Sequence, residues 1–196
     1  MALNIYKISE FNHKAKIVLF DELCKLLAER CEDGKEDCIV VGNYNVEGVE
    51  IDAIVVTQYG VMVFDFKNGG GNIVAREVGE WTQNGHSVAG GAYGKSPMVN
   101  ARMMRNRLCS SSSKLLGCQV SDAKVVVAFS MPSAIDDSAL SESTKSWLTV
   151  CDINNIADSL DKTLLGARVI SDEVFNAIPN QLRLSQFHIQ QGSANS

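Results

Sequence analysis

Two aspartates and a lysine in the middle of the chain have the residue types and the spacing of a metal-dependent hydrolytic site. They are Asp52, Asp65 and Lys67. Carboxylates on adjacent strands can hold Mg²⁺ and leave positions for water and a phosphate oxygen. The cation would polarise a phosphodiester and lower the pKa of a bound water, and a lysine beside it could orient that water or neutralise developing charge. The pattern therefore predicts Asp52 and Asp65 as metal ligands and Lys67 as a catalytic residue.

The same residues also allow a structural interpretation. Asp65 and Lys67 could form an ion pair that closes a strand, with Asp52 capping a loop. The Asp-x-Lys triplet is short and common. The spacing alone therefore leaves both interpretations open.

A β-hairpin over residues 50–68 must position these side chains. The stretch EIDAIVVTQYGVMVFDFKN is rich in β-branched and bulky residues, with a tight turn predicted at residues 58–60. Side chains of a strand alternate between its two faces. The odd-numbered residues from 61 to 67, which include Asp65 and Lys67, therefore share one face, and the even-numbered residues from 62 to 66 share the other.

Further elements are predicted around this hairpin. Apolar residues at three- and four-residue spacing predict a helix over 14–31. Ser96 as N-cap and Pro97 at the first position start a second helix that runs to about Leu108 or further, with the serines Ser110–Ser113 ending or fraying it. The other predicted strands are a strand over 38–43, a small hairpin over 73–78 and 81–83, a central strand over 123–129 and a strand over 147–151. A glycine-rich loop is predicted over 85–94 and a second loop over 130–146. Two further helices are predicted over 153–160 and 171–184, and the second has Ser171 as its cap and is broken or kinked at Pro179.

Charge is distributed unevenly along the chain. The net charge is −5, yet residues 67–121 carry seven basic and only two acidic residues. Local charge, not the total, decides whether a polyanion can dock. The middle third is therefore a candidate nucleic-acid surface.

The composition is that of a globular protein. The 196 residues predict a single domain over 1–189 with a flexible tail over 190–196. No apolar run is long enough to span a bilayer, and residues 1–14 lack the apolar core of a signal peptide. The six cysteines are scattered without a Cys-x-x-Cys, as in a cytoplasmic protein with reduced thiols, and the three histidines lie far apart, which argues against zinc.

The central stretch resembles the nuclease-related domain (NERD) family, which is similar to the PD-(D/E)XK restriction-endonuclease superfamily. The resemblance covers residues 15–130. It is carried by the hairpin from Gly48-Val49-Glu50-Ile51-Asp52 to Asp65-Phe66-Lys67-Asn68, by Glu22 in the first helix, by Trp81 after the lysine, and by the helix start Ser96-Pro97-Met98-Val99-Asn100-Ala101.

The resemblance implies an α/β fold with a restriction-endonuclease-like core, in which a central mixed sheet containing the hairpin is flanked by helices on both sides. It implies a nuclease that acts on DNA with Mg²⁺ or Mn²⁺, in which Glu22 supports the metal and Asn100 lies near the site. The basic helix would then follow the DNA backbone. The nucleic-acid-binding residues expected in and before this helix are Lys95, Asn100, Arg102, Arg105 and Arg107.

Three positions depart from the family pattern. Asp65 stands where glutamate is commoner, which shortens the reach to a metal by one methylene. Asn100 replaces the usual glutamine, and Asp21 replaces the glycine that usually precedes the helix glutamate. None of these departures removes a metal ligand or the lysine.

Two other functions stay open. The same fold could serve as a non-catalytic module that binds nucleic acid or a protein partner, and a homodimer is compatible with either function. Alternatively, the sequence from Ala89 to Ser96 fits a relaxed phosphate-binding loop of a nucleotide-binding protein, with 148–152, LTVCD, as a downstream acidic strand. That motif needs an apolar strand before the loop, and the residues TQNGHSV make a poor one.

Overall fold

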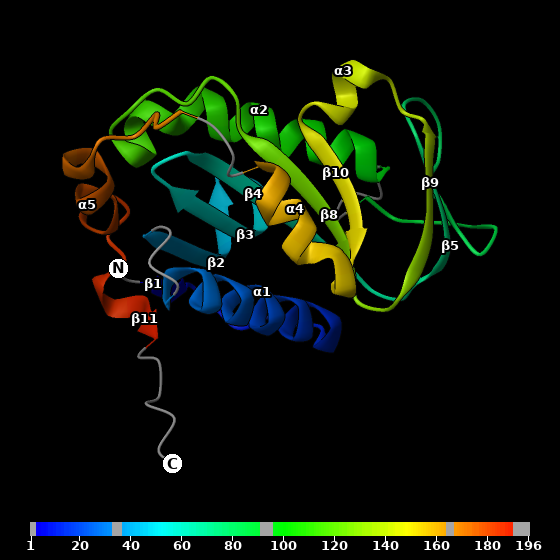
Figure 1. The fold of residues 1–196 in the computed structure, drawn as a ribbon, viewed down its shortest axis with the longest axis horizontal. Helices are drawn as coiled ribbons and strands as arrows, with labels where there is room; N and C mark the ends of the chain where they lie inside the picture. The colour runs from blue at the N-terminus through cyan, green and yellow to red at the C-terminus, as the bar shows by residue number, and fades with distance from the viewer. Residues whose placement is uncertain (1–2, 33–36, 91–95, 164–166, 190–196) are drawn as a thin grey trace, which may run out of the picture.

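The computed structural model describes residues 3–32, 37–90, 96–163 and 167–189 of the chain. They form a mixed α/β fold in which a large central sheet is covered by helices on both faces (Figure 1). The predicted fold class is thereby confirmed. The predicted tail, residues 190–196, lies outside the described residues.

The central sheet holds the predicted hairpin near its middle. Its strands, from one edge to the other, are β10 (Leu148–Asp152), β8 (Lys124–Phe129), β4 (Gly60–Lys67), β3 (Val49–Thr57), β2 (Cys38–Val46), β1 (Leu3–Lys7) and β11 (His188–Ile189). β3 runs antiparallel to both β2 and β4, whereas β4, β8 and β10 run parallel. The hairpin and the central strand over 123–129 are therefore confirmed, while β1 and β11 were not anticipated.

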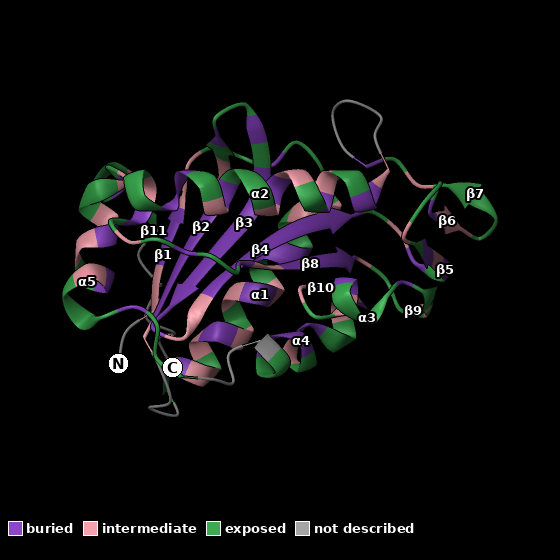
Figure 2. Cartoon of the chain, turned by 90° about the horizontal axis from the view of Figure 1, so that it is seen from above, coloured by how far each residue is buried: buried purple, intermediate pink, exposed green. Residues whose placement is uncertain are grey.

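The two faces of the sheet carry separate apolar cores. On one face, Val61 and Val63 pack in the core that includes α2 (Pro97–Leu116) and α5 (Asp172–Gln181). On the other, Met62 and Phe64 pack in the core that includes α1 (Lys14–Glu32) and α4 (Ile156–Thr163). Figure 2 shows the buried strands between these helical layers. The alternation predicted from the hairpin sequence is thereby confirmed.

A second, smaller sheet stands beside the first. Its strands, in order across the sheet, are β7 (His86–Ser87), β6 (Thr82–Gln83), β5 (Gly71–Arg76) and β9 (Ser133–Ala139). The predicted hairpin over 73–83 is confirmed, and Trp81 is fully buried beneath it with its indole N–H donating to Arg76 O (2.9 Å). Gly70 in the turn before β5 approaches other backbone closely, since a Cβ there would lie 2.7 Å from the carbonyl oxygens of Met131 and Pro132.

The prediction of a loop over 130–146 is wrong. This segment contains β9 and a short helix, α3 (Glu142–Lys145), which begins at the cap Ser141. β9 is polar and lies at an edge, and it is held as a strand by its parallel pairing with β5. Such pairing is a long-range contact that the local sequence does not signal.

The predicted end of α2 in the serine run is also wrong. The N-cap Ser96 and Pro97 at the start are as predicted, but the helix continues to Leu116 and ends at Gly117, whose φ of 74° is left-handed. Ser112 is fully buried, and its hydroxyl donates to Cys109 O and accepts from Val120 N–H. The run is helical because its serines bond within and beside the helix instead of competing with it.

Candidate active site

The two aspartates of the hairpin meet where β3 and β4 separate. The register that pairs Ala53 with Phe64 brings Asp52 opposite Asp65 at the next position along the strands. Both side chains are buried, with about 5% of each residue exposed (4% for Asp52, 5% for Asp65). The Asp52 side chain also links β3 to β4, because its Oδ2 accepts the backbone N–H of Phe66 (2.7 Å). The acidic pair, Asp52 and Asp65, is therefore fixed by the sheet itself.

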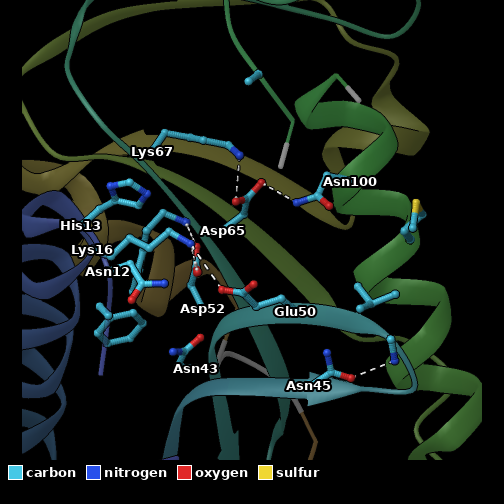
Figure 3. A pocket seen from close by; sticks show the side chains of 16 residues that line it. Asn12, His13, Lys16, Asn43, Asn45, Glu50, Asp52, Asp65, Lys67 and Asn100 are labelled. Atoms are coloured by element: carbon cyan, nitrogen blue, oxygen red, sulfur yellow. Dashed lines mark hydrogen bonds and ion pairs between the residues drawn. The ribbon is translucent and has the colours of Figure 1, made fainter. Parts of the chain in front are cut away.

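Lys67 and Asn100 hold the carboxylate of Asp65 from two sides (Figure 3). The Lys67 ammonium lies 2.9 Å from Asp65 Oδ1 and donates to the carbonyl oxygen of Gly90 at 2.7 Å. The Asn100 amide, from the first turns of α2, donates to Asp65 Oδ2 at 3.0 Å. The three sequence-predicted residues of the hairpin and Asn100 are thus brought together.

A second lysine holds Asp52. The Lys16 ammonium, from the first turn of α1, donates to Asp52 Oδ1 at 2.6 Å and lies 3.8 Å from Glu50 Oε1. Burial opposes the charge of Lys16, but Asp52, Glu50 and Asp65 outweigh that effect and raise the pKa of the ammonium. Lys16 is therefore a firmly charged partner of the acidic pair.

The pKa of Asp52 shifts in the direction opposite to that expected for an ion-paired carboxylate. Burial is the largest cause and the negative charge of Asp65 the second, and together they raise this pKa from 3.8 to about 6. The ion pair with Lys16 and the Phe66 N–H lower it, but they do not compensate. The two carboxylates consequently repel one another in a poorly solvated place, which favours the protonated form of Asp52.

The acidic pair opens into a polar pocket of about 480 Å³. Its polar walls come from the residues before and within α1, from β2, and from the start of β3 and of α2 (Figure 3). The polar lining residues besides the acidic pair and Lys67 are Asn12, His13, Lys16, Asn43, Asn45, Glu50 and Asn100. Amide, imidazole and ammonium groups of this kind can contact the phosphates and sugars of a nucleic acid.

Lys16 and the asparagines of the pocket were not identified from the sequence. Lys16 is 36 residues from Asp52, in a segment whose only strong signal is helical periodicity. The available signal was indirect, because a helix packed on the even-numbered face of the hairpin places its first turn near the strand ends.

Glu22 is not brought to this pocket. It lies on α1 with about a third of its side chain exposed (32%), 3.8 Å from Lys25, and it is absent from the pocket lining. It follows Lys16 by six residues, which is roughly 9 Å along a helix axis. Its expected role in supporting a metal therefore gains no geometric support, and the helix residue that reaches the acidic pair is Lys16.

The basic residues of α2 lie outside the pocket and contact acidic residues of the chain. Arg102 pairs with Glu77, Arg105 pairs with Asp122 and Arg107 pairs with Glu47. Arg105 also donates to a backbone carbonyl and lies over the ring of Trp147, and three-quarters of its side chain is buried. Lys95, the remaining predicted nucleic-acid contact, lies outside the described residues.

The phosphate-binding-loop hypothesis also falls partly on residues 91–95, which are outside the described ranges. The described flanks do not have the geometry that the motif needs. The strand before the loop, β7, is two exposed residues long and lies in the small sheet, not in the buried central one. Pro97 occupies the first turn of the following helix, as the sequence indicated.

No group of three or more His, Cys, Asp or Glu side chains within the described ranges is arranged to hold a metal ion. The acidic pair is thus a two-carboxylate arrangement. In the same ranges, no helix has the length and apolar character required to cross a membrane.

Comparison with known protein families gives a match over the middle of the chain. A family model described as the nuclease-related domain matches residues 21–129. This range includes the hairpin, the small β5–β6 hairpin, α2 and β8, and it leaves Lys16 outside. No curated protein and no solved structure matches the chain significantly. The match indicates a nuclease-related function.

Proposed function

The chain belongs to the nuclease-related domain family, and from this premise we propose that it is a divalent-cation-dependent nuclease that hydrolyses phosphodiester bonds of DNA. The observation that carries the proposal is the convergence of Asp52, Asp65 and Lys67 at one polar pocket. In a purely structural ion pair, Asp52 would have no need to be buried beside a second carboxylate.

The acidic pair is chemically suited to Mg²⁺ or Mn²⁺. Both cations prefer oxygen ligands, and Mg²⁺ is commonly held by one or two carboxylates together with waters and substrate phosphates. Each carboxylate oxygen of the pair accepts a hydrogen bond from the protein or forms an ion pair with it, and keeps a further lone pair. A cation bound by Asp52 and Asp65 would polarise the phosphodiester and lower the pKa of a bound water.

The side chains around the pair have separable roles in this proposal. Lys67, fixed by Asp65 and Gly90, supplies a positive charge that neutralises the charge developing on the phosphate. Asn100 fixes the orientation of the Asp65 carboxylate, and the Phe66 N–H does the same for Asp52. The positions of both carboxylates are therefore set before substrate arrives, which lowers the cost of reaching the reactive geometry.

The test is cleavage of supercoiled plasmid DNA with Mg²⁺ or Mn²⁺. The Asp65→Asn and Lys67→Met variants keep the side-chain size and remove one charge each. We expect each to reduce the cleavage rate by roughly a hundredfold or more, as for the loss of one transition-state contact.

Lys14→Met is the matched control, because Lys14 is an exposed lysine at the start of α1 that is absent from the pocket lining. It should cut at the wild-type rate. Equal cleavage by wild type, Asp65→Asn and Lys67→Met would contradict the proposal.

A non-catalytic binding module is the second candidate. The observation in its favour is that all four carboxylate oxygens of the acidic pair already accept a hydrogen bond or ion pair from the chain, so the network is complete without a cation. This candidate predicts DNA binding that weakens with salt, without cleavage under any metal condition.

A further inference from the structure

Two amines balance the two carboxylates of the site. Lys16 is 2.6 Å from Asp52, and Lys67 is 2.9 Å from Asp65. A divalent cation that enters this cluster meets two positive charges in contact with Asp52 and Asp65. Cation binding is therefore favoured only if one ammonium moves away from its carboxylate.

We propose that Lys16 occupies the cation position at Asp52 when no metal is bound, and that it transfers to a substrate phosphate when the metal binds. This inference rests on the proposed function, since it describes how the same site is loaded. It makes Lys16 a residue that couples metal binding to substrate binding.

The two lysines differ in how firmly they are held. The side chain of Lys67 is 10% exposed and has a backbone carbonyl, that of Gly90, as a second partner. The side chain of Lys16 is 25% exposed, and its ammonium contacts only the carboxylates of Asp52 and Glu50 within the described residues. Displacing Lys67 would leave the buried Gly90 contact unmade, whereas displacing Lys16 leaves no backbone group without its partner.

The Lys16 ammonium also has an alternative anionic partner within the same pocket. Glu50 is already 3.8 Å from the ammonium, lines the same pocket and has a side chain 57% exposed. The pocket beyond it is lined by His13 and by asparagines, and a phosphate placed there would meet the displaced ammonium. The lysine therefore exchanges one anionic partner for another without becoming an unpaired buried charge.

The exchange links the two binding steps. Without a phosphate, the metal must compete with Lys16 for Asp52, so its affinity is low. With a phosphate present, Lys16 has a new partner and the competition is relieved. By linkage, the metal raises the affinity for the phosphodiester by the same factor.

The test compares Mn²⁺ binding to wild type, Lys16→Met and the matched control Lys14→Met by calorimetry and by Mn²⁺ electron paramagnetic resonance. We expect Lys16→Met to bind Mn²⁺ at least tenfold more tightly than wild type, and Lys14→Met to bind like wild type. A short phosphorothioate DNA duplex should tighten Mn²⁺ binding to wild type by a larger factor than to Lys16→Met, because only wild type also relieves the competition with Lys16.

A second measurement uses only the unmodified chain and covers the case in which Lys16→Met does not fold. Acetylation of Lys16 by acetic anhydride, measured by mass spectrometry relative to Lys14, should accelerate when Mn²⁺ is saturating. An unchanged relative rate would overturn the proposal.

The outcomes separate the two proposals. If wild type binds Mn²⁺, Asp65→Asn weakens that binding and Lys16→Met leaves it unchanged or weaker, the role of Lys16 is refuted while the proposed nuclease site stands. If neither wild type nor Lys16→Met binds Mn²⁺, the cation site itself is refuted, and the role of Lys16 falls with it.

Discussion

Replacing Asp52 by asparagine should change how the stability of the protein depends on pH. The pKa of Asp52 is raised from 3.8 to about 6 by burial and by Asp65. The folded state therefore binds a proton more readily than the unfolded chain, so protonation of Asp52 stabilises the fold. This contribution is complete below pH 3.8 and is lost as the pH rises through about 6.

The size of the effect follows from the two pKa values. At pH 5 the difference between 3.8 and about 6 corresponds to about 1.4 kcal/mol of unfolding free energy, and at pH 8 to about zero. Asparagine cannot titrate. Relative to Asp52→Asn, the wild type should therefore lose about 1.4 kcal/mol between pH 5 and pH 8.

The assay is urea unfolding followed by tryptophan fluorescence, in buffer with a chelator so that no divalent cation contributes. Asp52→Asn also changes the contacts with Lys16 and the Phe66 N–H. The loss of these contacts shifts the unfolding free energy of the variant at every pH. The informative quantity is therefore how the difference in unfolding free energy between wild type and Asp52→Asn changes with pH. Asp158→Asn, at an exposed position of α4, is the control and should follow the wild-type pH profile.

Parallel profiles for wild type and Asp52→Asn between pH 5 and pH 8 would refute the reasoning. They would mean that Lys16 and the Phe66 N–H compensate fully for burial and for Asp65. The description of the acidic pair as mutually repelling would then be wrong.

Two further substitutions test the fold around the site. Ser112→Ala should destabilise the protein by about 1–3 kcal/mol, because the buried Val120 N–H loses its acceptor. The control Ser113→Ala, at an exposed position, should change the free energy of unfolding by less than about 0.5 kcal/mol. Urea unfolding measures both variants. Gly70→Ala should lower the thermal midpoint markedly, because its Cβ would meet two backbone carbonyl oxygens at 2.7 Å; a midpoint equal to that of wild type would contradict the close approach.

The elements predicted correctly are those whose signal is local. The alternation of side chains along the strands and the turn before Gly60 identify the hairpin in the sequence. Ser96 and Pro97 identify the start of α2. This local information placed Asp52 and Asp65 on adjacent strands, and the regular register of the structure brings them opposite one another.

The features that were missed depend on contacts between distant segments. β9 is polar and exists by pairing with β5, and the serines of α2 are helical because Ser112 bonds to Val120. In the site, Lys16 reaches Asp52 across 36 residues, while Glu22, the expected helix residue, does not line the pocket. Helical periodicity gives the buried face but does not give the position of the helix along the sheet.

The ion pairs of α2 determine how a polyanion would meet this protein. Arg102, Arg105 and Arg107 each face a carboxylate of the same chain. A phosphate that engages one of them must exchange with that carboxylate, and for the half-exposed side chains of Arg102 and Arg107 such an exchange gains little free energy. Part of the positive charge of residues 67–121 is therefore balanced by carboxylates of the same chain, which weakens the electrostatic attraction that α2 would exert on a nucleic acid.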